Sequence, residues 1–390
     1  MTSLLRSPAS SRVSSRRGFL PSRDPLRRLP GAFRDWEAAA RLLPKLLVSD
    51  HVRRTLESLP KFPLERLKSE REWRRAMLIL SYLGHAYVWG GDRPAEMMPA
   101  RLAVPWHAVA KRMGRPPVLS YASYALDNWF RLEPGRGPEL GNIGLLQNFM
   151  AGMDEEWFIL VHVDIELRAA PAIRALPNAQ ASAARGDSAR LMAGLREIEA
   201  GLDGMIRTML RMPERCDPYI YYHRVRPYIH GWKNHPDLPD GLIYEGVAEY
   251  GGKPQRFRGE TGAQSAIVPC LDAALGIEHQ PDELKTYLLE MREYMPPEHR
   301  AMLQALEARE PVRTYVERQG GAALRRAYDG CVERVERFRS IHLEYAARYI
   351  YKQAQTDAKN PSDVGTGGTP FMRYLKKHRD ETHEHLLAEN

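Results

Sequence analysis

One histidine lies on the apolar stripe of the long helix predicted near the C-terminus. From Leu324 the apolar positions follow one another in steps of four and three, the spacing of a single buried helical face. These positions are Leu324, Tyr328, Cys331, Val335, Phe338, His342, Tyr345 and Tyr349. A buried imidazole without a partner costs roughly 1 to 3 kcal/mol. His342 is therefore expected either to hydrogen-bond a neighbour or to coordinate a metal ion, and the spacing leaves both roles open.

A second histidine interrupts the apolar run that begins at Trp157. His162 stands among aliphatic residues and shares a helical face with Phe158, four positions earlier. A hydrogen-bonded core histidine and a functional one are both compatible with this position.

An arginine in the stretch 219–233 has the chemistry to bind a carboxylate. Arg226 precedes Pro227, which disfavours helical backbone before it, so we expect Arg226 at a break between two elements. A guanidinium flanked by tyrosines can hold a carboxylate through two parallel hydrogen bonds beside an aromatic ring. The alternative is an arginine whose aliphatic stem covers apolar surface.

The sequence GTGGT at 365–369 places two hydroxyl groups in a glycine-rich loop. It is no phosphate loop, because no Gly-Lys-Ser/Thr follows it and no strand precedes it. Two interpretations fit this loop, which spans about 357–370: a flexible connector, or a hinged lid over a pocket.

Helices are expected to position these residues, because helical periodicity runs through most of the chain. The clearest amphipathic helix is predicted over 188–212, where Pro213 ends it. No run of short alternating strands appears, which favours an all-α fold. Prolines and glycines crowd near residue 140 and predict a boundary between a small N-terminal domain, 18–140, and a large helical domain, 141–390.

Charge, cysteine content and hydropathy argue against several classes of protein. The net charge is +8, but residues 1–30 hold seven arginines and one aspartate, so the basic excess lies mostly in a tail and nucleic-acid binding is not expected.

The three cysteines are far apart and form no disulfide framework, which fits a reducing compartment, the cytoplasm. The longest uncharged stretch, 76–91, has 16 residues, fewer than the ~20 of a membrane span. We expect this stretch to be a buried helix.

The N-terminal segment 1–17 is rich in serine and arginine, and we expect it to be a disordered tail. Organelle transit peptides share this composition, so that alternative stays open.

Seven segments, in the same order along the chain, resemble the indoleamine 2,3-dioxygenase family. They are RAMLILSYLGHAYVWG (75–90), PPVLSYASYALDNW (116–129), RVRPYIHGWK (224–233), LPDGLIYEGV (238–247), YMPPEHR (294–300), FRSIHL (338–343) and GTGGT (365–369). The resemblance extends from about Gly18 to the C-terminus. It implies a two-domain, all-helical haem enzyme that uses molecular oxygen to open the pyrrole ring of tryptophan, giving N-formylkynurenine.

The resemblance also implies roles for single residues. It implies that His342, in FRSIHL, is the proximal ligand of haem b, that Arg339 supports this region, and that Asp272 is the acidic partner of Arg339. Arg226 matches the residue that holds the substrate carboxylate. An external electron donor would keep the haem ferrous, and we expect a monomer or a weak homo-oligomer.

Other matching residues lie in the family's substrate pocket. Phe158 matches a ring that packs on the indole, and Tyr121 matches another wall of the distal pocket. Thr366, in GTGGT, matches a lid threonine near the substrate's ammonium group and a haem propionate.

Five residues of the expected pocket depart from the vertebrate pattern. His162 replaces a small hydroxyl side chain and resembles the distal histidine of the separate tryptophan 2,3-dioxygenase family. The other departures are Tyr124, Tyr221, Glu260 and Thr261, the last two in the loop expected beside the haem. These departures leave two alternatives to L-tryptophan dioxygenation: oxidation of another indole compound, and a haem-binding sensor without turnover.

Overall fold

The computed structural model describes residues 13–354 and 371–387, and within these ranges the chain is mostly helical. The predicted all-α class is confirmed. Strands occur there only as two-residue segments: β1(Met97–Met98) pairs in parallel with β4(Ile243–Tyr244), and β2(Phe130–Arg131) pairs antiparallel with β3(Ile143–Gly144). The predicted loop with Thr366 lies outside the described residues.

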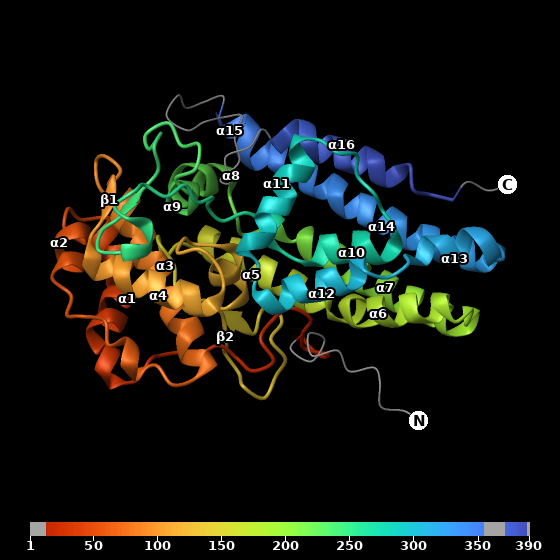
Figure 1. The fold of residues 1–390 in the computed structure, drawn as a ribbon, viewed down its shortest axis with the longest axis horizontal. Coiled ribbons are helices and arrows are strands. Elements are labelled where there is room, and N and C mark those ends of the chain that lie inside the picture. Colours follow the sequence, from red (N-terminus) through yellow and green to blue (C-terminus); the bar gives the residue numbers. More distant parts are fainter. Residues whose placement is uncertain (1–12, 355–370, 388–390) are drawn as a thin grey trace.

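Four N-terminal helices form one end of the molecule, drawn in red and orange in Figure 1. They are α1(Arg34–Leu47), α2(Val52–Glu57), α3(Glu70–Trp89) and α4(Ala100–Met113). α3 begins at a capping box, because Ser69 accepts a hydrogen bond from the Glu72 amide while the Glu72 carboxylate accepts one from the Ser69 amide. The apolar stretch near 76–91 lies within α3 and is buried, as predicted. A Cβ at Gly84 would lie 2.2 Å from the Trp106 ring, so this glycine lets α3 and α4 approach closely.

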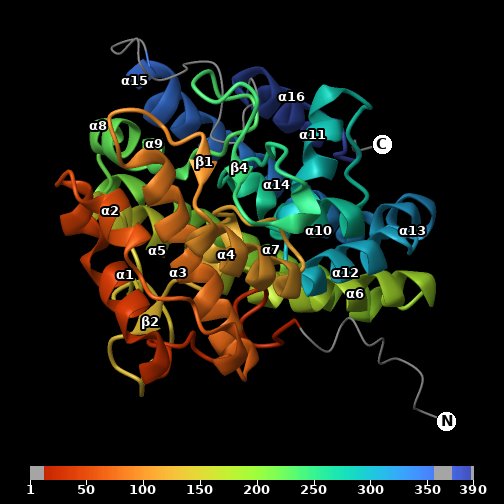
Figure 2. The ribbon, with the colours of Figure 1, turned by 60° about the vertical axis from the view of Figure 1, so that its left-hand side comes forward.

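Helices from the later part of the chain form the other end (Figures 1 and 2). They are α6(Ala170–Ala184), α7(Ser188–Met209), α10(Ile267–Leu275), α11(Glu283–Met291), α12(Pro297–Glu307), α13(Val312–Gln319), α14(Ala322–Ala346) and α16(Phe371–His383). α14 packs against both α7 and α16. The predicted amphipathic helix at 188–212 is confirmed as α7, but α7 ends at Met209, and Pro213 lies in the 3₁₀ turn that follows.

Two buried apolar clusters make up the core, and α5(Met153–Arg168) contributes to both. Ile159, Leu160 and Val163 belong to the cluster shared with α1, α3 and α4, whereas Val161 and Ile165 belong to the cluster shared with α6, α7 and α14. The helix that carries His162 therefore lies between the two cores. The division into domains at residue 140 stays a prediction.

Short helical segments connect these elements. Three of them are π-helical turns, η3(Ala122–Leu126), η5(Tyr221–Val225) and η9(Ala347–Tyr351). The short α-helices are α8(Pro218–Ile220), α9(Arg226–Ile229) and α15(Lys352–Ala354). The remaining segments are 3₁₀ turns, η1(Gly31–Phe33), η2(Leu64–Arg66), η4(Met212–Glu214), η6(Ala248–Tyr250), η7(Gly262–Gln264) and η8(Arg292–Tyr294). π-Helical turns are rare and occur often at functional sites, and here η3 carries Tyr124 and η5 carries Tyr221.

Part of the predicted disordered tail is folded. Residues 13–17 were expected in the tail, but Ser14 and Gly18 exchange two backbone hydrogen bonds, and Arg17 forms a 2.9 Å ion pair with Asp24. These contacts fix a basic segment whose composition alone resembles disorder. None of the helices in 13–354 and 371–387 is long and apolar enough to cross a membrane.

Candidate active site

His342 combines exposure to solvent with a lowered pKa. The residue is exposed to solvent. Desolvation by the surrounding protein nevertheless lowers the pKa of the imidazole to about 4. The stripe of α14 is buried at Tyr328, Cys331 and Val335, and becomes accessible at His342. A neutral imidazole that is reachable by a small molecule and surrounded by protein can act as a metal ligand.

His162 is held in one tautomer by its own helix. Its Nδ1 lies 2.7 Å from the carbonyl oxygen of Phe158, and because a carbonyl only accepts, the ring proton is on Nδ1. Burial lowers the pKa of His162, so the ring is neutral and its Nε2 keeps a free lone pair. Burial is the main cause of the lowered pKa of His342, and repulsion between the two rings when both are protonated adds to it, which places both imidazoles within electrostatic range of each other.

Aromatic rings surround His162. The Phe158 ring lies 4.6 Å from the imidazole and stacks on the Tyr221 ring at 4.3 Å, and the Tyr121 ring lies 6.0 Å from the imidazole, edge-on. Tyr124 lies 6.3 Å from the same phenylalanine ring. The structure therefore brings together all four aromatic residues that the sequence placed in the pocket.

Tyr221 connects this aromatic group to the helix of His342. Its ring meets that of Tyr349 edge-on at 6.1 Å, and the Tyr349 hydroxyl donates a 2.7 Å hydrogen bond to the Cys216 carbonyl. Tyr349 belongs to η9, which continues α14. Two segments far apart in the sequence are thus held around one site.

Arg226 is fully buried and is the first residue of α9. Its guanidinium lies 5.2 Å from the centre of the Tyr222 ring, a cation–π distance. The predicted break in the backbone is wrong in detail, because φ and ψ of Arg226 are −54° and −38°, which is helical. The steric effect of Pro227 disfavours this conformation without forbidding it, and η5 runs directly into α9. The residue nevertheless marks the junction of two elements, as expected.

The loop that carries Glu260 and Thr261 packs tightly against the end of α9. A Cβ at Gly231 would lie 2.2 Å from the Gly259 amide nitrogen, so the two backbones cross in contact, and the Glu260 amide donates a 3.1 Å hydrogen bond to the Ile229 carbonyl. Burial raises the pKa of the Glu260 carboxyl to about 8. Burial raises the pKa of Tyr121, Tyr124 and Tyr221, and the Glu260 carboxylate adds a smaller contribution to each, so Glu260 lies near these predicted pocket residues. Thr261 caps η7.

Arg339 lies almost one turn before His342 on α14. Its Nη2 donates a 2.6 Å hydrogen bond to Oδ2 of Asp272, the acidic partner that the resemblance implies. The arginine thus ties α14 to α10.

Comparison with known proteins now decides the family. The family model described as indoleamine 2,3-dioxygenase matches residues 7–385. The chain is 37% identical to indoleamine 2,3-dioxygenase 1 of Rattus norvegicus, with 93% of this chain and 92% of the relative covered. It is 34% identical to indoleamine 2,3-dioxygenase 2 of Homo sapiens, covering 97% and 95%. It is 33% identical to the 6-hydroxytryptophan 2,3-dioxygenase of Fusarium equiseti, covering 96% and 97%.

The chain belongs to the indoleamine 2,3-dioxygenase family. Members of this family are haem-dependent oxidoreductases of the dioxygenase class, which makes the chain an enzyme that acts on an indole compound with O2.

One residue of this indoleamine 2,3-dioxygenase site was missed from the sequence. Glu166 is buried on α5, one turn beyond His162, and accepts a 2.8 Å hydrogen bond from the Ser265 hydroxyl. Burial raises the pKa of its carboxyl to about 7, and Tyr121 lies against it. The positions 158, 162 and 166 share one helical face, so the spacing of four that linked the first two could have found the third.

Proposed function

We propose that this enzyme is a haem-dependent dioxygenase that inserts O2 across the indole C2–C3 bond of L-tryptophan and so forms N-formylkynurenine. The observation that carries the proposal is the accessible, neutral imidazole of His342, within electrostatic range of a second neutral imidazole, His162, which lies among four aromatic rings. A neutral imidazole on one side and aromatic walls on the other fit a planar haem and a planar indole.

His342 would hold the iron of haem b, and Arg339, paired with Asp272, would fix the helix that carries it. The bound haem supplies activation of O2. An external electron donor would keep the iron ferrous.

The chain's own residues would bind and orient the substrate. Arg226 would hold the substrate carboxylate, and the Phe158 ring would stack on the indole. His162 Nε2 would accept a hydrogen bond from the indole N–H, because its Nδ1 proton is engaged by the Phe158 carbonyl. Such positioning converts a collision into a reaction between neighbouring groups. We propose that Tyr121, Tyr221 and Thr261 complete the walls, and that Thr366 contributes from the loop.

Two measurements test this proposal. Ferrous protein supplied with haem and L-tryptophan in air is expected to form N-formylkynurenine, detected by its ultraviolet absorbance. His342→Ala is expected to lose the Soret band of histidine-ligated haem and the product together. A Soret band unchanged in the variant would contradict the ligand assignment, and a haem-loaded wild type without product would support the sensor.

A ring-hydroxylated tryptophan is a second candidate substrate. The Tyr124 hydroxyl is buried and has no hydrogen-bond partner among the described residues, although its ring lies beside Phe158. An unpaired buried hydroxyl costs about 1 to 3 kcal/mol, which a polar substituent on the substrate would recover. The Fusarium equiseti relative is named for 6-hydroxytryptophan.

Competition between substrates decides between these candidates. If the substituent meets Tyr124, the wild type prefers 6-hydroxytryptophan over L-tryptophan in kcat/KM, and Tyr124→Phe abolishes this preference. If L-tryptophan is the substrate, wild type and Tyr124→Phe both prefer it.

A further inference from the structure

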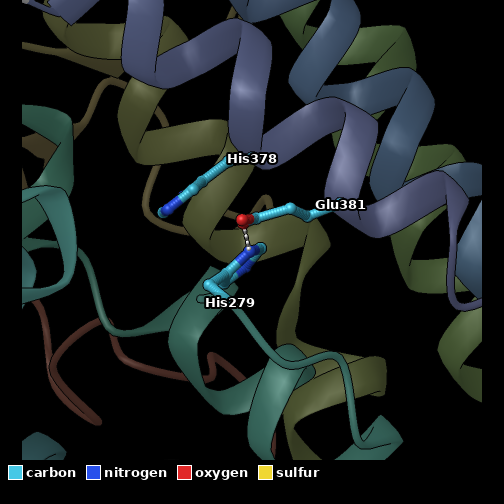
Figure 3. Close-up of side chains that lie close together, drawn as sticks. All are labelled: His279, His378 and Glu381. Atoms are coloured by element: carbon cyan, nitrogen blue, oxygen red, sulfur yellow. Dashed lines mark hydrogen bonds and ion pairs between the residues drawn. The ribbon is translucent and has the colours of Figure 1, made fainter. Parts of the chain in front are cut away.

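Two histidines and a glutamate gather on the side of Arg339 that faces the C-terminal helix. His279 lies in the loop after α10, and His378 and Glu381 lie one turn apart on α16 (Figure 3). One possible ligand atom from each residue lies within 4.8 Å of the other two. His378 and Glu381 are buried and His279 is nearly so.

One hydrogen bond and one ring contact already hold these three side chains together. Nδ1 of His279 donates to Oε2 of Glu381 over 2.7 Å, and the His279 and His378 rings stack with centroids 3.9 Å apart. Nε2 of His378 is buried and has no hydrogen-bond partner in 13–354 and 371–387, and the whole residue is only 9% exposed. A buried imidazole nitrogen without a partner, stacked on a second imidazole and beside a carboxylate, lacks the ligand that would satisfy it.

We propose that His279, His378 and Glu381 bind one divalent transition-metal ion, with zinc as the best match. Two imidazoles and one carboxylate form a donor set that zinc accepts, with a fourth position for water or another oxygen. The donors of a tetrahedral zinc site lie about 3.3 Å apart, since each bond is about 2.0 to 2.1 Å long. The 2.7 Å pair of His279 and Glu381 would open slightly as the ion replaces the shared proton, and the His378 ring would turn toward it.

The surrounding charges favour a cation. Three carboxylates, those of Asp272, Asp282 and Glu381, face this region, against the cations Arg339 and Lys377. With neutral imidazoles, the balance is one negative charge. A divalent cation reverses that sign, and the buried carboxylates stabilise it.

Asp272, itself held by Arg339, supplies the outer support that metal-bound histidines usually have. Binding through Nδ1 leaves the His279 ring proton on Nε2, 3.4 Å from Oδ2 of Asp272. Nη2 of Arg339, 3.2 Å from the same nitrogen, donates to it only while the ring proton is on Nδ1; with the ion bound, the guanidinium keeps its 2.6 Å hydrogen bond to that carboxylate oxygen. A carboxylate–histidine–metal arrangement orients the ring and raises its basicity. The ion would therefore join α16 to the loop after α10 and, through Arg339, to the helix of His342.

Zinc binding to the full-length chain tests the inference, which does not depend on the substrate. After removal of metals with a chelator, the wild type is expected to bind one equivalent of Zn²⁺ in a calorimetric titration, confirmed by elemental analysis. The same equivalent is expected in His342→Ala, because the site is separate from the haem ligand. His378→Phe, which keeps a ring on His279, and Glu381→Gln are expected to weaken binding by more than about 100-fold, and Asp272→Asn by about 10- to 100-fold.

His383→Gln is the matched control, because His383 is an exposed histidine of the same helix, paired with Glu336. It is expected to retain the full equivalent. X-ray absorption at the zinc edge of the wild type adds a readout that needs no variant, with imidazole scattering expected from two ligands. No stoichiometric binding, an equivalent that survives both His378→Phe and Glu381→Gln, or a zinc spectrum without imidazole scattering would overturn the proposal.

Discussion

The Nδ1–H of His162 donates a 2.7 Å hydrogen bond to the carbonyl oxygen of Phe158, one turn earlier on the same helix. This bond ties the distal imidazole to the residue whose ring is proposed to stack on the indole. It also decides which nitrogen can meet the substrate, because Nε2 alone is left as an acceptor. The orientation of the imidazole is therefore built into α5 before any substrate binds.

The first prediction concerns the indole N–H. The wild type is expected to have a higher kcat/KM for L-tryptophan than for 1-methyl-L-tryptophan, which lacks that hydrogen, by about 10-fold or more, equivalent to one hydrogen bond of about 1.5 kcal/mol. His162→Ser is expected to reduce this ratio. Steady-state kinetics with both substrates measure it, and a ratio that is the same in variant and wild type would remove His162 from the indole contact.

The second prediction concerns the substrate carboxylate. Arg226→Ala is expected to lower kcat/KM by about 10- to 150-fold. This factor corresponds to a loss of about 1.5 to 3 kcal/mol, the range for one hydrogen bond to a charged group. Arg224→Ala is the matched control, because Arg224 is exposed two residues earlier. It is expected to retain wild-type kinetics. Tryptamine, which has no carboxylate, is expected to be insensitive to both changes, and equal losses for tryptamine and L-tryptophan in Arg226→Ala would point to a purely structural role.

Much of the fold could be predicted from the sequence, because long helices carry periodic apolar faces. The apolar stripes of α14 and α7 could both be recognised, although α7 ends at Met209, before Pro213. The three π-helical turns could not be predicted, since they depend on tertiary packing rather than on residue pattern. The helical backbone of Arg226 could not be predicted either, because η5 runs directly into α9 although Pro227 disfavours helical backbone at the residue before it.

The candidate site was only partly predictable for a related reason. His342 and His162 interrupt apolar faces, so each could be singled out, and the resemblance placed them in one pocket. The grouping of His279 with His378 and Glu381 depends on α16 lying against α14 and the loop after α10, a contact between positions about 100 residues apart. Local spacing carries no information on such a contact.

The third prediction concerns the packing of α3 on α4. Gly84→Ala is expected to destabilise the protein by about 1 to 3 kcal/mol, because the new methyl group would lie 2.2 Å from the rigid Trp106 ring. Gly31→Ala is the control, since nothing lies within 4 Å of a Cβ there. Urea unfolding measures both midpoints, and a Gly84→Ala midpoint equal to that of Gly31→Ala would show that the helices separate at little cost.

The fourth prediction concerns the pH dependence of stability. Burial raises the pKa of Glu260 from its ordinary 4.5 to about 8, so between these pH values the folded protein binds a proton that the unfolded chain releases. This group therefore makes its full contribution below about pH 4.5 and loses it as the pH rises toward 8, by at most about 5 kcal/mol. Glu260→Gln stays neutral throughout. From pH 5 to pH 8, the unfolding free energy of the wild type is expected to fall relative to that of Glu260→Gln. Relative to Glu156→Gln, an exposed control on α5, it is expected to change far less. Parallel pH profiles for wild type and Glu260→Gln in urea unfolding would mean that Glu260 is ionised in the folded protein across this range.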